Sequence, residues 1–110
     1  MDAIAKEALL YDFYGELLSE NQKEIFSLSV MDDMSLSEIA AEQGVSRQAV
    51  SAMIGRCRRI LLSYEERLGL LKRFQDMSRA ASEIKELAER LEGPEAERIK
   101  MLSDSILSRL

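Results

Sequence analysis

The fold of this chain is decided by residues 35–62, which read SLSEIAAEQGVSRQAVSAMIGRCRRILL. The segment predicts two helices joined by a tight turn. Ser35 and Glu38 form the pattern of a capping box, in which the serine hydroxyl accepts an N–H of the first turn and the glutamate accepts the serine N–H. Gly44 is placed to end the first helix in the left-handed conformation, which costs glycine no Cβ clash. Ser46 then caps the second helix.

The small and apolar residues of this segment have the spacing of a DNA-binding helix-turn-helix. Ala40 is followed four residues later by Gly44, and then by Val45 and the cap Ser46. The small Ala40 side chain allows the two helices to cross closely. We therefore predict a helix-turn-helix, a motif that serves in nucleic-acid binding and also in protein–protein modules.

The composition of the 110-residue chain favours helices throughout. It is rich in Leu, Ala, Glu and Arg, it contains one proline, and no stretch alternates apolar and polar residues as a strand does. A first helix is expected at about residues 4–18, and a capping box of Ser19 and Gln22 opens a second that ends near Met31. We predict an all-α protein with a helix-turn-helix domain at residues 1–62 and a long helical tail at residues 63–110.

Apolar residues at spacings of three and four continue from the second helix of the helix-turn-helix into this tail. The seam includes Ile60, Tyr64, Leu68, Leu71 and Phe74, and it fits either a helix that folds back on its own domain or a contact with a second copy. A capping box of Ser63 and Glu66 would restart the helix there. No proline or glycine lies between Gly69 and Gly93, so helix is expected to continue with little interruption to about Leu91, before the break at Gly93-Pro94 and a last helix. The tail is therefore a candidate dimerisation element.

The charge is unevenly distributed, although the chain as a whole carries a net charge of −5. Residues 1–34 hold two basic and eight acidic residues, residues 35–62 hold four and two, and residues 63–110 hold nine and ten. Phosphate binding depends on Lys and Arg, so the overall balance argues against a general nucleic-acid coat protein. Only the helix-turn-helix has surplus positive charge.

The sequence offers little for catalysis or for a metal. It has no histidine, and its single cysteine, Cys57, is expected on the inward side of a helix. A zinc site and a disulfide within the chain are therefore excluded, and no phosphate loop or nucleophile motif is present. We expect no enzymatic activity, no cofactor and no metal. No apolar run approaches the ~20 residues of a membrane span, so a cytoplasmic protein is expected.

A helical projection of the second helix predicts which residues point away from the core. With Val50 at the centre of the buried side and steps of ~100° per residue, Gln48, Ala52, Gly55 and Arg59 point outward. Gln48 could pair with an adenine edge, and Arg47 and Arg59 could reach guanine or phosphate. The alternative is a solvated helix face. The candidate nucleic-acid-binding residues are Ser46, Arg47, Gln48, Ser51, Ala52, Gly55, Arg56 and Arg59.

Several of these motifs resemble known families. Residues 18–25, 33–40 and 44–50 resemble region 4 of bacterial sigma factors. A fuller resemblance, over about residues 8–76, is to the YlxM-type, p13-like family of helix-turn-helix proteins, and it is carried by residues 11–14, 46–50 and 64–68. It implies a sigma-region-4-like bundle followed by a helical tail.

The same resemblance implies a role in the signal recognition particle pathway, as a regulatory protein that binds the RNA or the GTPase of that particle. A DNA-binding transcriptional regulator that acts through its recognition helix is the alternative. The chain lacks the further regions of a complete sigma factor. The acidic residues outside the helix-turn-helix favour a basic protein partner over extensive contact with a phosphate backbone.

Overall fold

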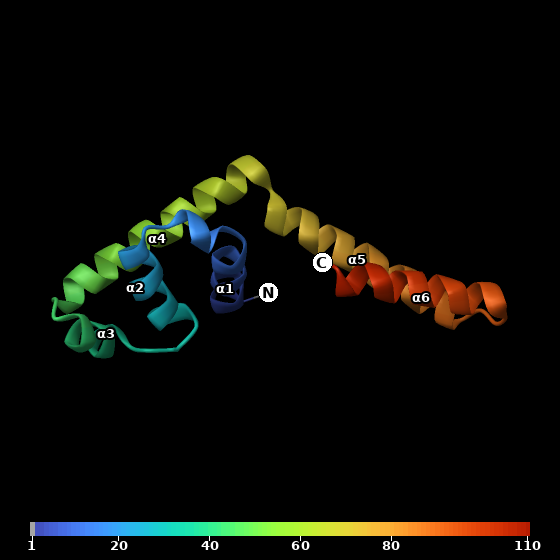
Figure 1. The fold of residues 1–110 in the computed structure, drawn as a ribbon, viewed down its shortest axis with the longest axis horizontal. Coiled ribbons are helices and arrows are strands. Elements are labelled where there is room, and N and C mark those ends of the chain that lie inside the picture. Colours follow the sequence, from blue (N-terminus) through green and yellow to red (C-terminus); the bar gives the residue numbers. More distant parts are fainter. Residues whose placement is uncertain (1) are drawn as a thin grey trace. The chain divides into compact units, whose positions relative to one another are not determined.

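The structure is a computed structural model that describes residues 2–110, and within that range it contains helices and no strands (Figure 1). This confirms the predicted all-α fold class. The chain divides into two compact units, one ending at Gly69 and one formed by Leu70–Leu110. The helices are α1 (Ala3–Tyr14), α2 (Glu20–Val30), α3 (Leu36–Gln43), α4 (Arg47–Leu68), α5 (Leu70–Glu89) and α6 (Pro94–Ser108), with a 3-10 turn (Gly15–Leu17) after α1.

The first unit is organised around α4, which contacts α1, α2 and α3. All three shorter helices lie along one side of α4 (Figure 1). The buried side of α4 carries apolar residues at helical spacing, and each shorter helix buries apolar residues of its own, so one core forms between them. The core residues are Leu10, Tyr14, Leu18, Ile25, Phe26, Ile39, Ala40, Val50, Ile54, Cys57 and Leu61.

The helix-turn-helix has the local structure that the sequence predicts. Ser35 Oγ accepts the Glu38 N–H at 3.1 Å, and Glu38 Oε1 accepts the Ser35 N–H at 3.1 Å, so the capping box is complete. Gly44 ends α3 with φ 68°, and Ser46 Oγ accepts the Ala49 N–H at 3.0 Å. The reciprocal hydrogen bonds of Ser19 and Gln22 likewise open α2.

The first helix is shorter than predicted. It ends at Tyr14, a 3-10 turn follows, and Leu18 is extended with ψ 156°. The reason lies in the next helix: its N-cap Ser19 needs extended backbone with ψ 162°, so the chain must leave the helical conformation before residue 18. As a result Leu17, at the end of the predicted helix, is 54% exposed.

The boundary between the two parts of the chain is corrected from residue 62 to Gly69. Ser63 and Glu66 lie inside α4 and do not restart a helix, so α4 runs without interruption to Leu68. It ends where Gly69 adopts φ 63° and donates its N–H to the Glu65 carbonyl. The seam predicted through residues 60–74 is therefore divided between two helices. Helix resumes directly after Gly69 in α5 and ends at Glu89, close to the predicted end at Leu91.

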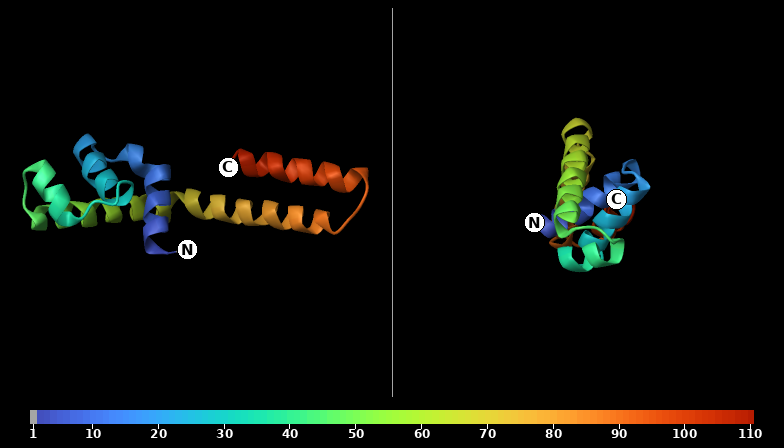
Figure 2. Two further views of the ribbon diagram at one scale, coloured as in Figure 1. Left: turned by 90° about the horizontal axis from the view of Figure 1, so that it is seen from below. Right: turned by 90° about the vertical axis from the view of Figure 1, so that its left-hand side faces the viewer.

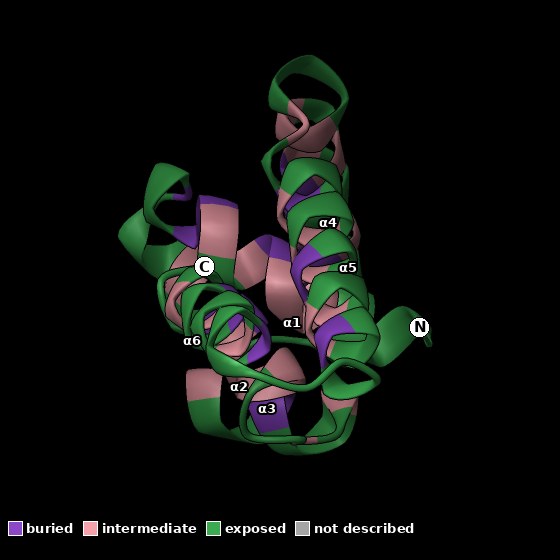
Figure 3. Ribbon diagram, turned by 90° about the vertical axis from the view of Figure 1, so that its right-hand side faces the viewer, coloured by how far each residue is buried: buried purple, intermediate pink, exposed green. Residues whose placement is uncertain are grey.

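The second unit is a hairpin of α5 and α6. The two helices run in opposite directions side by side (Figure 2), and the chain reverses at Gly93, whose φ is 108°, before Pro94 begins α6. The view along the hairpin shows its buried residues between the two helices and exposed residues around them (Figure 3). Between these helices the buried side chains are small: Ala81, Ala88, Ala96 and Ser103.

One ion pair joins the two helices of the hairpin. Lys85 Nζ lies 2.9 Å from Asp104 Oδ1, and this hydrogen bond raises the pKa of Lys85. Both side chains are partly exposed, so the pair adds little stability. The ion pair shows which side of the hairpin is polar.

None of the helices formed by residues 2–110 is long and apolar enough to cross a lipid bilayer.

Candidate nucleic-acid interface

Most of the outward face of α4 is exposed. Val50, Ile54, Cys57 and Leu61 anchor the opposite side in the core, so the fold presents the outward side chains to solvent. Met53, which precedes Ile54 on the same helix, is half-buried. Of the predicted site residues, Gly55 is half-buried and the others are exposed: Ser46, Arg47, Gln48, Ser51, Ala52, Arg56 and Arg59.

The arginines of α4 differ in whether an acidic side chain of the same protein pairs with them. Arg58 forms an ion pair with Glu7 of α1. Among residues 2–110, Arg47, Arg56 and Arg59 have no acidic partner. Three guanidinium groups are therefore available on this helix for an external anion.

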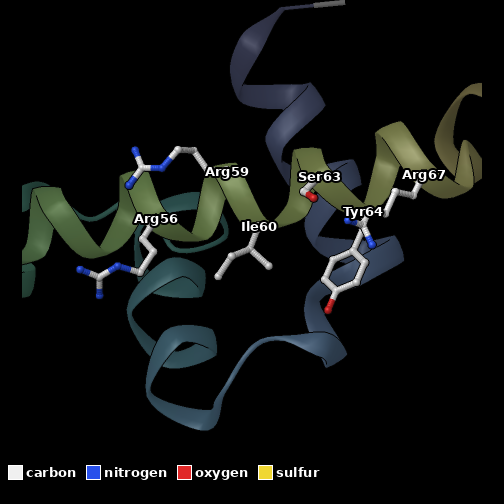
Figure 4. A pocket seen from close by; sticks show the side chains of 6 residues that line it. All are labelled: Arg56, Arg59, Ile60, Ser63, Tyr64 and Arg67. Carbon is white, nitrogen blue, oxygen red and sulfur yellow. The ribbon is translucent and has the colours of Figure 1, made fainter.

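Two of these arginines line a surface pocket of about 400 Å³ that also includes residues beyond the predicted site. Figure 4 shows the side chains spaced along one flank of α4, with Ile60 and Tyr64 between the arginines. A guanidinium group offers several donors in a plane, which suits a phosphate group. The lining residues are Arg56, Arg59, Ile60, Ser63, Tyr64 and Arg67.

The aromatic wall of this pocket is held in place by α1. The Tyr64 ring stacks on the Tyr14 ring, with 6.0 Å between centroids and 22° between planes. Tyr14 is 1% exposed, and its hydroxyl donates a hydrogen bond of 2.6 Å to Glu65 Oε1. Tyr64 is thus a fixed surface beside the arginines, although the sequence pattern placed it in an apolar seam.

Sequence reasoning missed Ser63, Tyr64 and Arg67 as site residues because it ended the domain at residue 62. The signal was present: Ser63 and Arg67 follow Arg59 at four-residue steps, which keeps them on one helix face. It becomes visible only when α4 is known to continue past residue 62. Arg67 is exposed and has no acidic partner among the described residues.

Two other predicted features have local explanations. The Ser46 hydroxyl is already engaged in capping α4. Cys57 is fully buried, and burial raises the pKa of its thiol, which opposes thiolate chemistry. Residues 2–110 contain no group of three or more His, Cys, Asp or Glu residues arranged to hold a metal ion.

The chain was compared with known protein families. The model of the family described as "Putative helix-turn-helix protein, YlxM / p13 like" matches residues 1–101. The chain belongs to this family. The YlxM-type resemblance and the predicted helix-turn-helix are thereby confirmed.

Individual relatives agree with the family match. The UPF0122 protein YlxM of Bacillus subtilis is 51% identical over 79 residues, which cover 72% of each chain. A UPF0122 protein of Symbiobacterium thermophilum is 43% identical over 90 residues, covering 82% of this chain and 84% of the relative. A third, from Bacillus velezensis, is 48% identical over 86 residues, or 78% of each chain. The similarity thus extends beyond the helix-turn-helix into the second unit.

Proposed function

We propose that this protein binds nucleic acid through the exposed face of α4. The observation that carries the proposal is the set of four exposed arginines along one helix that have no acidic partner among residues 2–110: Arg47, Arg56, Arg59 and Arg67. Neutralising phosphate with such side chains releases counterions, which is a main source of affinity for nucleic acid.

The face divides into two parts with different expected roles. Near the start of α4, Arg47 and Gln48 stand beside the turn, where a recognition helix contacts base edges. Gln48 can pair in two places with adenine, and Arg47 with guanine. Farther along, Arg56, Arg59 and Arg67 surround the pocket and are assigned to phosphate groups.

The glycine at position 55 supports the proposal that a ligand approaches α4 closely. Glycine in an exposed helix interior costs about 1 kcal/mol relative to alanine. A Cβ at position 55 would meet only an Arg59 guanidinium nitrogen at 3.6 Å, an ordinary contact. Packing inside the protein therefore does not require glycine here, whereas close approach of a ligand backbone would.

The change Gly55→Ala separates these two explanations. We expect it to raise the free energy of unfolding by about 1 kcal/mol, because alanine favours the helix, and to weaken nucleic-acid binding. Urea denaturation and fluorescence anisotropy measure the two effects. A variant that is more stable and binds equally well would show that no ligand approaches position 55.

The arginine assignment is tested by the triple change Arg56→Ala, Arg59→Ala and Arg67→Ala. Each phosphate contact contributes roughly 0.7–0.9 to the slope of log affinity against log salt, so the slope should fall by about two units. The matched control removes three exposed arginines from the hairpin: Arg79→Ala, Arg90→Ala and Arg98→Ala. Equal effects of the two triple variants, or no effect of either, would refute the assignment.

Gln48→Ala should act differently from the arginine changes. Losing a base contact relaxes preference for one sequence by an energy on the order of 1–3 kcal/mol, with little change in the salt slope. The measurement compares the preferred ligand with one altered at the contacted base. Uniform weakening across all ligands would assign Gln48 to the backbone instead.

For the target, we propose the RNA or the GTPase of the signal recognition particle, as the family resemblance implies. Of these two, the acidic surface favours the GTPase, because Asp12, Asp32 and Asp33 are exposed without an ion-pair partner among residues 2–110. Such charges repel a phosphate backbone that extends beyond α4 and attract a basic protein.

The alternative function is specific DNA recognition, which the exposed N-terminal end of α4 favours. A specific DNA regulator should prefer its site over random duplex by ~1000-fold or more. The experiment measures binding to the particle's RNA, to its GTPase and to selected and random duplex DNA in one buffer at physiological salt. Nanomolar binding of a selected duplex, without detectable binding to the particle, would favour specific DNA recognition over a role with the signal recognition particle.

A further inference from the structure

Apart from Leu71, which is buried, the large apolar side chains of the hairpin are mostly exposed, and its other buried side chains are small. Its two helices approach through the small residues described above, and larger residues beside them are 36–58% exposed. Contiguous exposed apolar surface on a protein commonly marks an interaction site. The large residues are Met77, Ile84 and Leu87 on α5, Leu91 in the turn after it, and Ile99, Leu102 and Ile106 on α6; we call this set the apolar face.

The register of the two helices places the apolar face on one side of the hairpin. On α5, Met77 and Ile84 lie seven residues apart, and Leu91, in the turn after the helix, continues this spacing. Each of the three lies four residues before or three after a buried alanine. On α6, Ile99 and Ile106 repeat in the same way beside the buried Ala96 and Ser103. In an antiparallel pair, equivalent heptad positions of both helices lie on the same side. The ion pair of Lys85 and Asp104 occupies the other side.

Charge is separated along the hairpin. We call residues 83–97 the tip, and residues 70–82 together with 98–110 the open end. The tip contains six acidic and two basic residues, and the open end contains six basic and two acidic residues. The two ends therefore carry opposite net charges of equal size, because the antiparallel hairpin brings the start of α5 and the end of α6 together.

We propose that a second copy of this chain covers the apolar face, with the tip of each hairpin against the open end of the other. The two hairpins then form an antiparallel four-helix bundle around a two-fold axis. Apolar faces meet in its centre, and opposite charges meet at both ends. The occupant is a second copy for two reasons. The apolar face can pack against an identical apolar face, and reversing one hairpin places its acidic tip against the basic open end of the other.

The rim of the apolar face identifies the charged contacts. Glu95 lies on it at the tip, and Arg73 and Arg109 lie on it at the open end. All three are exposed and have no ion-pair partner among residues 2–110. The antiparallel bundle places Glu95 of one copy beside Arg73 and Arg109 of the other. This dimer replaces the contact predicted along residues 60–74, and it stands independently of nucleic-acid binding.

The apolar part of the interface is tested by sedimentation equilibrium of the full chain. Wild type should have twice the 12.5 kDa mass of one chain. The double change Ile84→Glu and Ile99→Glu should raise the dissociation constant by at least ~100-fold, because it buries unpaired carboxylates. The control Met101→Glu adds the same charge on α6 at a residue that is 63% exposed and points away from the apolar face, so it should remain dimeric.

The arrangement is tested by exchanging charges. Glu95→Arg alone, and Arg73→Glu with Arg109→Glu, should each weaken the dimer about 10-fold at low salt. All three changes together should restore it, which a merely structural defect would not allow. If Glu95→Arg strengthens the dimer, the tips lie together and the antiparallel arrangement is wrong. A wild type that is monomeric at millimolar concentration, or a dimer that tolerates both glutamates at 84 and 99, would overturn the proposal.

Discussion

The two units of this protein bury opposite kinds of side chain. The first unit encloses Tyr14, Phe26, Leu10 and Ile39 almost completely, because α1, α2 and α3 surround one side of α4. In the hairpin, α5 and α6 contact each other through alanine and serine, and most large apolar residues stay at the surface. The first unit thus has a core of its own, whereas the hairpin leaves most of its large apolar residues exposed, as the proposed dimer requires.

The comparison predicts its largest effect for Phe26→Ala. Phe26 is 0% exposed and its ring lies 5.8 Å from the Tyr11 ring, so truncation should cost about 3–5 kcal/mol of unfolding free energy. The matched change Leu87→Ala, at a residue 53% exposed, should cost the single chain less than about 1 kcal/mol.

Cys57 allows this difference to be measured in one unit. It is the only cysteine, it lies in the first unit, and burial protects it and raises the pKa of its thiol. Reaction with a thiol reagent in increasing urea therefore reports the opening of the first unit. Phe26→Ala should expose Cys57 at lower urea, whereas Leu87→Ala should leave its reaction unchanged. An equal shift in both variants would show that the core of the first unit is not independent of the hairpin.

The small-residue contact of the hairpin should be sensitive to added volume. Ala88 is 2% exposed, so Ala88→Leu should force α5 and α6 apart at a cost of about 1–3 kcal/mol. Ala80→Leu, at an exposed alanine of the same helix, is the control. Circular dichroism should show earlier loss of helix in Ala88→Leu while Cys57 remains protected. Exposure of Cys57 at the same urea concentration would mean that the units unfold together.

A smaller effect is expected at the turn of the first unit. A Cβ at position 44 would contact nothing within 4 Å, so the cost of Gly44→Ala comes from its φ of 68° alone. We expect about 1 kcal/mol. Gly44→Asn should recover part of it, because asparagine tolerates the left-handed conformation. Urea denaturation measures both, and equal losses would point to a steric cause instead.

The smallest effect concerns pH and Glu38. Hydrogen bonds from the Ser35 N–H and hydroxyl lower the pKa of Glu38 below its ordinary value near 4.5. The ionised group therefore stabilises the fold above pH 4.5, and this contribution is lost as pH falls through the lowered pKa. Relative to Glu38→Gln, which retains a capping side chain, wild type should lose stability on acidification. If the free energy of unfolding depends on pH in the same way in both proteins, Glu38 does not contribute to that dependence.

The sequence by itself determined the local features of this protein. The caps at Ser19, Ser35 and Ser46 and the left-handed Gly44 depend on groups within four residues, so a short pattern contains all the information. The helix-turn-helix and the outward orientation of Gln48, Ala52 and Arg59 follow from helical periodicity. This is why most of the candidate site was predictable, including its exposed arginines.

The tertiary structure decided which helix faces are used. Glu7 pairs with Arg58, and Tyr14 bonds to Glu65, across 51 residues of sequence in each case. These contacts remove Arg58 from the set of available arginines and fix Tyr64 beside the pocket. The hairpin likewise buries Ala81, Ala88 and Ala96 and leaves most of its leucines and isoleucines exposed. Periodicity marks a residue as apolar, but only the packing of distant segments determines whether the same chain covers it.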